Sequence, residues 1–156
     1  MNKIDPDVFT FYKELTKNNN RNWFEHQKER FKKLELGVKK FRLTGGEPLV
    51  RKNIISVIEH LFELKEKNKI LEHTLTTNGT NLEKYSPILK KNGVDRINVS
   101  LDSLNPIKYK EITKWGNLEK VINGIRSAIN EGIKVKINTV LTQDFNDEEK
   151  IGRAHV

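Results

Sequence analysis

The sequence predicts an α/β fold in which four parallel strands form part of a (β/α) barrel, preceded by two N-terminal helices. Four short runs of alternating apolar and polar residues are separated by segments in which apolar residues recur at helical spacing. Crossovers of this kind join parallel strands, whereas hairpins need only short turns. Each run also has one apolar and one polar face, while strands of doubly wound sheets are usually apolar on both faces. A polar second face suits a barrel whose lumen holds a polar ligand.

The two N-terminal helices are predicted from a start signal and from apolar spacing. The first begins at Asp5-Pro6-Asp7, where an acidic cap is followed by proline in the first turn. Its apolar residues at helical spacing are Val8, Phe11, Tyr12 and Leu15. Three asparagines at 18–20 end it, and a second helix is expected over 22–35. That helix carries Trp23, Phe24, Gln27 and Phe31.

The β/α pattern begins after Gly37. Strands are predicted over 39–44, 71–77, 96–101 and 134–141. Helices are predicted over 52–67, 82–92, 106–113 and 118–131, of which 106–113 is a short extra one.

Polar and glycine-containing loops follow three of these strands, at 44–47, 76–79 and 100–103. The carboxyl ends of barrel strands lie at one face of the barrel, which is where such folds place their sites. Any one of these loops could also be an ordinary turn between a strand and a helix, since glycine and asparagine favour tight turns. Three of them beside a shared polar face favour a ligand site.

Composition limits the class of protein. With 156 residues, 35% of them hydrophobic, the chain is long enough for one domain with its own core. No stretch approaches the roughly 18 apolar residues of a membrane helix, so no membrane partner is expected. The N-terminus lacks the apolar core of a signal peptide, which predicts a cytoplasmic protein.

Charge and cysteine content exclude further classes. The net charge of +8 is spread along the chain, with +2 in residues 1–35, +4 in 36–149 and +2 in 150–156. Nucleic-acid binders usually concentrate basic residues on one face or arm, so no nucleic-acid partner is expected. The absence of cysteine excludes disulfides, thiolate zinc sites, a cysteine nucleophile and a cysteine-held iron–sulfur cluster.

Four blocks of sequence carry a resemblance to a known family. They are Gly-Val-Lys-Lys-Phe-Arg-Leu-Thr-Gly-Gly-Glu-Pro-Leu-Val-Arg at 37–51, Leu-Thr-Thr-Asn-Gly at 75–79, Arg-Ile-Asn-Val-Ser-Leu-Asp-Ser-Leu at 96–104, and Lys-Val-Lys-Ile-Asn at 134–138. Through these blocks, residues 34–149 resemble the radical S-adenosylmethionine (SAM) enzymes. The spacing of all four is most similar to that of the GTP 3′,8-cyclases, lyases of molybdenum cofactor biosynthesis. The resemblance implies an incomplete radical SAM barrel of the TIM type.

The resemblance also implies ligands and site residues. SAM and GTP are the implied small-molecule ligands. The family holds SAM at the positions of Gly46 and Ser100 and contacts GTP at those of Arg42, Thr76 and Lys136. Glycine lets a ligand approach the backbone, and cations on a lumen face suit a triphosphate.

Two further expectations concern acidic side chains near these positions. Glu47 is expected to accept a hydrogen bond from the methionyl ammonium group of SAM. Asp102 offers a different partner for Arg42 or Lys136, in which case those cations would be paired within the protein.

The family's chemistry needs a four-iron four-sulfur cluster, held by Cys-x-x-x-Cys-x-x-Cys after the first barrel strand, and a second cysteine-held cluster. This chain has no cysteine, so the prediction is an inactive fragment without catalytic or metal-binding residues. A cysteine-free module that binds SAM or a nucleotide is the alternative. A third reading is an interaction protein led by Trp23 and Phe24.

The two ends predict a chain of three parts. Residues 1–33 resemble the opening of an uncharacterised bacterial domain family with an Asn-Asn-x-x-Trp-Phe signature and are expected to be a foreign helical segment. Residues 34–149 are the partial barrel. Residues 151–156 match a translated sequencing adapter, so 150–156 is expected to be an artefactual tail. The helix over 22–35 is expected to pack Phe31 and Leu34 near Ile58 or Leu61.

Overall fold

The computed structural model describes residues 10–11, 13–14, 17–18, 21–27 and 39–149. The elements in chain order are α2 (Arg21–His26), β1 (Lys40–Leu43), the 3-10 helix η1 (Pro48–Val50), α4 (Ile54–Glu66), β2 (Glu72–Thr77), α5 (Leu82–Lys91), β3 (Arg96–Ser100), α6 (Pro106–Thr113), α7 (Leu118–Asn130) and β4 (Lys134–Asn138). The chain divides into two compact units, one of residues 1–41 with 52–72 and the other of residues 42–51 with 73–156.

The four strands form one open parallel sheet in the order β1-β2-β3-β4, which confirms the predicted fold class. Strands that neighbour each other in sequence therefore neighbour each other in the sheet, as right-handed β/α crossovers produce. The register aligns Thr74, Arg96 and Lys134 in one row across β2, β3 and β4. Two residues further along, Thr76, Asn98 and Lys136 form a second row on the same face.

In the first unit, α4 and the starts of β1 and β2 follow from simple patterns. Helix α4 buries one residue per turn on a single stripe: Ile54, Ile58, Leu61 and Leu64. The carbonyl of Lys39 accepts hydrogen bonds from the amides of Leu71 and Glu72, at 2.7 and 3.2 Å. An ion pair of 3.3 Å between Lys40 and Glu72 lies beside them.

The N-terminal part of the same unit is mostly helical where it is described, and includes α2. The Phe11 side chain is fully buried, and its ring centroid lies 5.7 Å from that of Trp23. Trp23 thus belongs to a packed aromatic pair. The predicted packing of Phe31 and Leu34 lies outside the described residues.

In the second unit, α5 and α7 pack closely against each other because of one glycine. Gly124 lies on the buried face of α7. A Cβ at this position would lie 2.8 Å from the Gly79 carbonyl oxygen and 2.9 Å from the Leu82 Cβ. Gly79 itself has a φ of +79°, a left-handed conformation that glycine adopts at little cost. The first turn of α5 can therefore approach the backbone of α7 only because residue 124 has no side chain.

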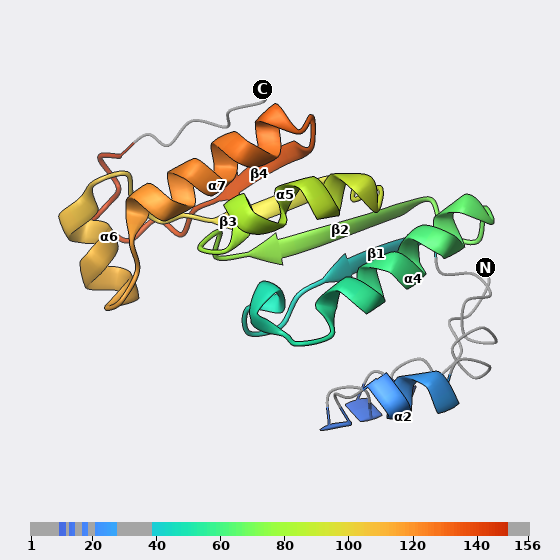
Figure 1. The fold of residues 1–156 in the computed structure, drawn as a ribbon. Coiled ribbons are helices and arrows are strands. Elements are labelled where there is room, and N and C mark those ends of the chain that lie inside the picture. The colour runs from blue at the N-terminus through green and yellow to red at the C-terminus, as the bar shows by residue number, and fades with distance from the viewer. Residues whose placement is uncertain (1–9, 12, 15–16, 19–20, 28–38, 150–156) are drawn as a thin grey trace, which may run out of the picture. The chain divides into compact units, whose positions relative to one another are not determined.

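The two helices lie on the apolar face of the sheet at β3 and β4 (Figure 1). Leu75, Ile97 and Val99 are fully buried on that face. A Cβ at Gly79 would lie 3.1 Å from a methyl group of Val99 on β3 and 2.9 Å from one of Val121 on α7, so α7 packs on this side. Figure 1 shows α5 and α7 side by side along the strands. The one-sided apolar pattern of the strands thus predicted where these helices lie.

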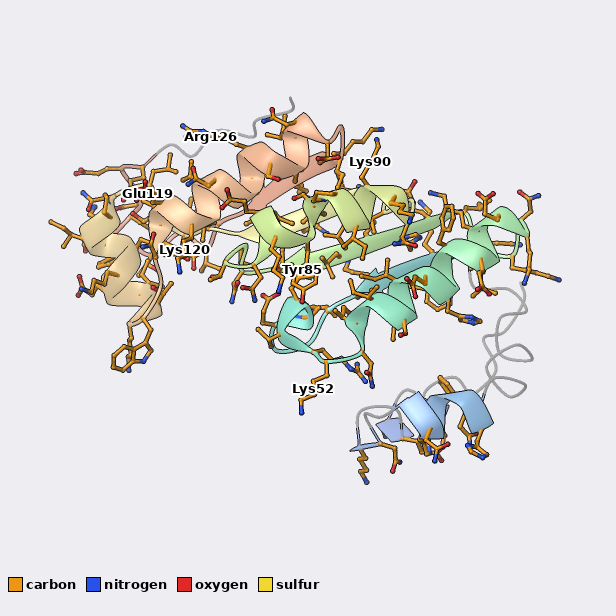
Figure 2. The ribbon with its side chains drawn as sticks, in the orientation of Figure 1. Lys52, Tyr85, Lys90, Glu119, Lys120 and Arg126 are labelled. Carbon is orange, nitrogen blue, oxygen red and sulfur yellow. The ribbon has the colours of Figure 1, made fainter. Side chains whose placement is uncertain are left out.

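The outer faces of the same helices carry charges of both signs. Figure 2 labels Lys90 on α5 and Glu119, Lys120 and Arg126 on α7, and all four are exposed. These side chains are solvated surface residues of amphipathic helices.

Helix α5 contains a proline, which the neighbouring helix accommodates. Pro87 has no N–H to donate to the carbonyl of Glu83, four residues earlier. The hydroxyl of Ser127 on α7 donates to that carbonyl at 3.4 Å. The gap in the hydrogen bonding of α5 thus faces the helix that packs against it.

From residue 39 onward the predicted boundaries agree with the structure to within a few residues, with two differences, whereas most of the helix predicted over 22–35 lies outside the described residues. The strand expected over 134–141 ends at Asn138. Beyond it, the Thr139 hydroxyl donates to the Leu101 carbonyl at 2.8 Å and the Val140 amide donates to the Asp102 carboxylate at 2.8 Å. These bonds to a loop replace the strand ladder. The second difference is η1, which forms because Glu47 caps it and Pro48 occupies its first position.

None of the helices in the described ranges is long and apolar enough to cross a membrane.

Candidate functional site

The loop after β1 offers open backbone at two adjacent glycines. Gly45 has a φ of +120°, a conformation that favours glycine. A Cβ added at Gly45 or at Gly46 would meet nothing within 4 Å. None of the residues that the structure describes therefore requires residue 46 to be glycine, and the space beside it fits a ligand that approaches the backbone.

Glu47 joins this loop to the end of β2. One carboxylate oxygen accepts hydrogen bonds from the Thr77 hydroxyl at 2.7 Å and from the Leu49 amide at 3.0 Å. The other oxygen accepts from the Asn78 amide at 2.6 Å. A carboxylate has about four acceptor positions, so one remains for a further donor. Glu47 thus connects the loops after β1 and β2 through its hydrogen bonds. Its contact with the ammonium group of a ligand stays a prediction.

Two of the predicted GTP residues share one row of the sheet. Thr76 on β2 and Lys136 on β4 align with Asn98 of β3 between them, which places them two strand spacings apart, or about 10 Å. Lys136 is exposed, Thr76 is half-buried and Asn98 is buried. The amide group of Asn98 donates to the Leu75 carbonyl at 3.5 Å. The row therefore offers a hydroxyl and a cation on the face opposite α5 and α7.

The third predicted GTP residue, Arg42, is exposed on β1. The pairing of Arg42 or Lys136 with Asp102, which the sequence left open, does not occur among the described residues. Asp102 instead accepts a hydrogen bond from the Val140 amide. Both cations are therefore available to an anionic ligand.

Ser100 is the last residue of β3 and is exposed. It lies opposite Asn138, the last residue of β4, and the next amide, that of Leu101, donates to the Asn138 carbonyl at 3.0 Å. Ser100 ends one parallel strand and the Gly46 loop follows the end of another, so they lie at the same edge of the sheet.

A polar cluster at the loop that follows Ser100 was not predicted from the sequence. It consists of Ser103, Asn146 and Glu149, of which the first two are buried. Glu149 accepts from the Ser103 hydroxyl, at 2.7 and 2.9 Å to its two oxygens, and from the Leu104 amide at 2.7 Å. No sequence signal pointed to this contact, because its partners lie 45 and 46 positions apart in the chain.

The electrostatics of the cluster follow from these contacts. The hydrogen bond from Ser103, then that from Leu104, and the charge of Lys108 3.8 Å away lower the pKa of Glu149. Nearby, burial raises the pKa of Tyr109, and the negative charge of Asp102 adds to this effect.

The residues present fit one of the two implied groups. The open backbone at Gly46 and the exposed hydroxyl of Ser100 suit the polar methionyl end of SAM. The four-iron four-sulfur cluster does not fit, because the sequence contains no cysteine. Within the described ranges there is also no group of three or more acidic or histidine side chains that could hold a metal ion.

Comparison with known proteins shows the family to which the chain is related. The sequence model of the Radical SAM superfamily matches residues 11–152. Over 113 residues the chain is 56% identical to a GTP 3′,8-cyclase of Sinorhizobium medicae, an alignment that covers 72% of this chain and 32% of that relative. Over 116 residues it is 53% identical to a GTP 3′,8-cyclase of Brucella ovis, which covers 74% of this chain and 34% of the relative.

The chain thus spans about a third of the length of these curated relatives. The superfamily match covers most of the chain, including the loop at 44–47 and the strands of the polar row. The chain belongs to the Radical SAM superfamily.

Proposed function

We propose that this chain is the ligand-binding core of a GTP 3′,8-cyclase, able to bind SAM and GTP but unable to convert them. The observation that carries the proposal is the row formed by Thr76, Asn98 and Lys136 on a face that α7 does not cover. Its hydroxyl and its cation are groups that bind phosphates. The curated relatives that match most of this chain are named GTP 3′,8-cyclases, which supports GTP as the ligand.

SAM would lie along the strand ends, with its methionyl part beside Gly46 and Ser100. The support is the empty space beside the Gly46 backbone and the exposure of Ser100. Glu47 would contribute its remaining acceptor position to the ammonium group. Arg42, exposed on β1, would add a second cation for GTP.

The proposal does not include catalysis, because the sequence contains no cysteine. The chain offers no thiolate for a cluster, so it has no means to cleave SAM. Binding is therefore the property to measure. Both ligands are cytoplasmic small molecules, and we propose the same compartment for this chain.

Binding of GTP is tested by calorimetry on the purified chain and on Lys136→Ala. Hydrogen bonds to charged groups contribute about 1.5–3 kcal/mol, and the open site favours the low end, so the affinity for GTP should fall about tenfold. The affinity for SAM should not change, because Lys136 contacts only GTP in the proposed arrangement.

Lys134→Ala is the matched control. Lys134 lies on the same strand and the same face as Lys136, two residues earlier, and is equally exposed. The Lys134→Ala variant removes the same charge farther from the strand ends, so its affinity for GTP should fall less than twofold. If the two variants bind GTP equally well, the loss reflects net charge alone and the proposed site is wrong.

We also propose that the chain has three parts: a foreign segment at 1–33, a barrel at 34–149 and an unrelated tail at 150–156. The alignments with the two cyclases span 113 and 116 residues, close to the length of the middle part. The superfamily match, which begins at residue 11, extends further toward the N-terminus. One continuous long sequencing read across the codons for 32–36 would refute the division, and a break there would support it.

A further inference from the structure

Residues 101–104 of the loop that follows Ser100 are hydrogen-bonded to the end of β4 and to the segment that follows it. The Leu101 amide donates to the Asn138 carbonyl, and the Leu101 carbonyl accepts from the Thr139 hydroxyl. The Asp102 side chain accepts from the Val140 amide. These contacts join the carboxyl ends of β3 and β4 beyond the sheet ladder.

Asn146 continues this contact with three hydrogen bonds. Its side-chain nitrogen donates to the carbonyls of Asp102, at 2.6 Å, and Val140, at 2.9 Å. Its side-chain oxygen accepts from the Thr142 amide at 2.6 Å. Only 1% of Asn146 is exposed. One buried amide group thus fixes the two loops against each other.

Glu149 completes the contact at Ser103 and Leu104. The Ser103 hydroxyl donates to the Glu149 carboxylate and accepts from the Asn105 amide at 3.0 Å. Asn105 in turn caps α6, accepting from the amides of Ile107 and Lys108. Lys108 also donates to the Phe145 carbonyl, one residue before Asn146. The Glu149 carboxylate therefore holds the loop between Ser100 and the start of α6 through its hydrogen bonds with Ser103 and Leu104.

We propose that Asn146 and Glu149 are positioning residues for the SAM end of the site, because they fix the loop that begins at Ser100. The proposal rests on the proposed function, in which Ser100 contacts SAM. Neither side chain belongs to the β3–β4 ladder, whose register runs from Arg96 opposite Lys134 to Ser100 opposite Asn138. Their loss should therefore release the loop and leave the sheet in place.

Thr76 and Lys136 lie within the strands, away from this loop. The two ligands consequently respond differently to the loss of the Glu149 charge. SAM affinity falls, and GTP affinity does not. A residue that merely stabilised the fold would change both together.

The test measures SAM and GTP binding by calorimetry on the full chain, on Glu149→Gln and on Glu149→Asp. Hydrogen exchange of the Leu104 amide is followed in the same samples. Glu149→Gln should weaken SAM binding about tenfold and speed exchange at Leu104, since charge-assisted hydrogen bonds are about twice as strong as neutral ones. Its affinity for GTP should stay within about twofold. Glu149→Asp, which keeps the carboxylate, should recover part of the SAM affinity.

Glu148→Gln is the matched control. Glu148 is the preceding residue and is exposed, so this variant loses the same charge without the contact to Ser103. It should bind both ligands as the parent chain does. SAM affinity that is equal in Glu149→Gln and Glu148→Gln would overturn the proposal, and so would a parallel loss of SAM and GTP binding. A parent chain that binds neither ligand would instead refute the proposed function, together with the inference that rests on it.

Discussion

Replacing Glu47 by glutamine tests whether this side chain connects the loops after β1 and β2. Glutamine has the same shape, but one of its two acceptor oxygens becomes an NH2 group that faces a donor. The variant therefore loses either the bond from the Asn78 amide or the bonds from Thr77 and Leu49. The Thr77 side chain is only 2% exposed, so water cannot fully replace a lost partner there. A hydrogen bond to a charged group contributes about 1.5–3 kcal/mol, and because Glu47 is only half-buried we expect a loss of about 2 kcal/mol.

Urea denaturation followed by circular dichroism measures this loss. With a slope of about 2 kcal/mol per M, the midpoint should fall by about 1 M. Glu111→Gln serves as the control, since Glu111 lies exposed on α6 and the substitution changes net charge equally. Its midpoint should stay within about 0.25 M of the parent, because exposed charges contribute little. If the two variants shift equally, Glu47 does not connect the loops, and the reasoning from its three hydrogen bonds is refuted.

Three further predictions follow from the structure and the composition. Gly124→Ala should lower the unfolding free energy by about 1 kcal/mol, because crowding at the Gly79 carbonyl and Leu82 exceeds the gain in helix propensity; a higher thermal midpoint would contradict this. Anaerobic reconstitution with iron and sulfide should give no cluster absorbance and no 5′-deoxyadenosine. A cluster absorbance would disprove the predicted absence of a cluster, and 5′-deoxyadenosine would disprove the predicted inactivity. The pKa of Glu149 is lowered from 4.5, chiefly by Ser103, so its contribution to stability is present above pH 4.5 and is lost as the pH falls through the lowered value. The difference in stability between the parent and Glu149→Gln should therefore shrink in acid, and a constant difference would exclude this linkage.

The fold was largely predictable from the sequence because the relevant signals are local. Apolar and polar residues alternate from Arg96 to Leu101, which distinguishes the two faces of β3, and the helical spacing of apolar residues predicts α5 and α7. The end of β4 was not predictable. The residues after Asn138 have strand-like composition, and the hydrogen bonds that divert them are donated by Thr139 and Val140 to Leu101 and Asp102, 38 positions away in sequence.

The candidate site was predictable only in part, for the same reason. The family motif located Gly46, and alternation placed Thr76 and Lys136 on one face. Glu47 was read as a ligand contact, yet its carboxylate is mostly engaged by Thr77 and Asn78, a role that depends on tertiary contacts. The buried Asn146 had no signal either, since an asparagine in an acidic turn is unremarkable until its partners are known.

The sequential strand order has a consequence for how this chain acquires its structure. Partners on β2 and β3, such as Thr74 and Arg96, are 22 positions apart, and partners on β3 and β4, such as Arg96 and Lys134, are 38 apart. Closing the longer loop costs about 0.5 kcal/mol more in chain entropy. During synthesis the β2–α5–β3 unit also leaves the ribosome before β4. We therefore expect each β/α repeat to dock on the one already formed, so that the nascent polypeptide gains order progressively from its early to its late repeats.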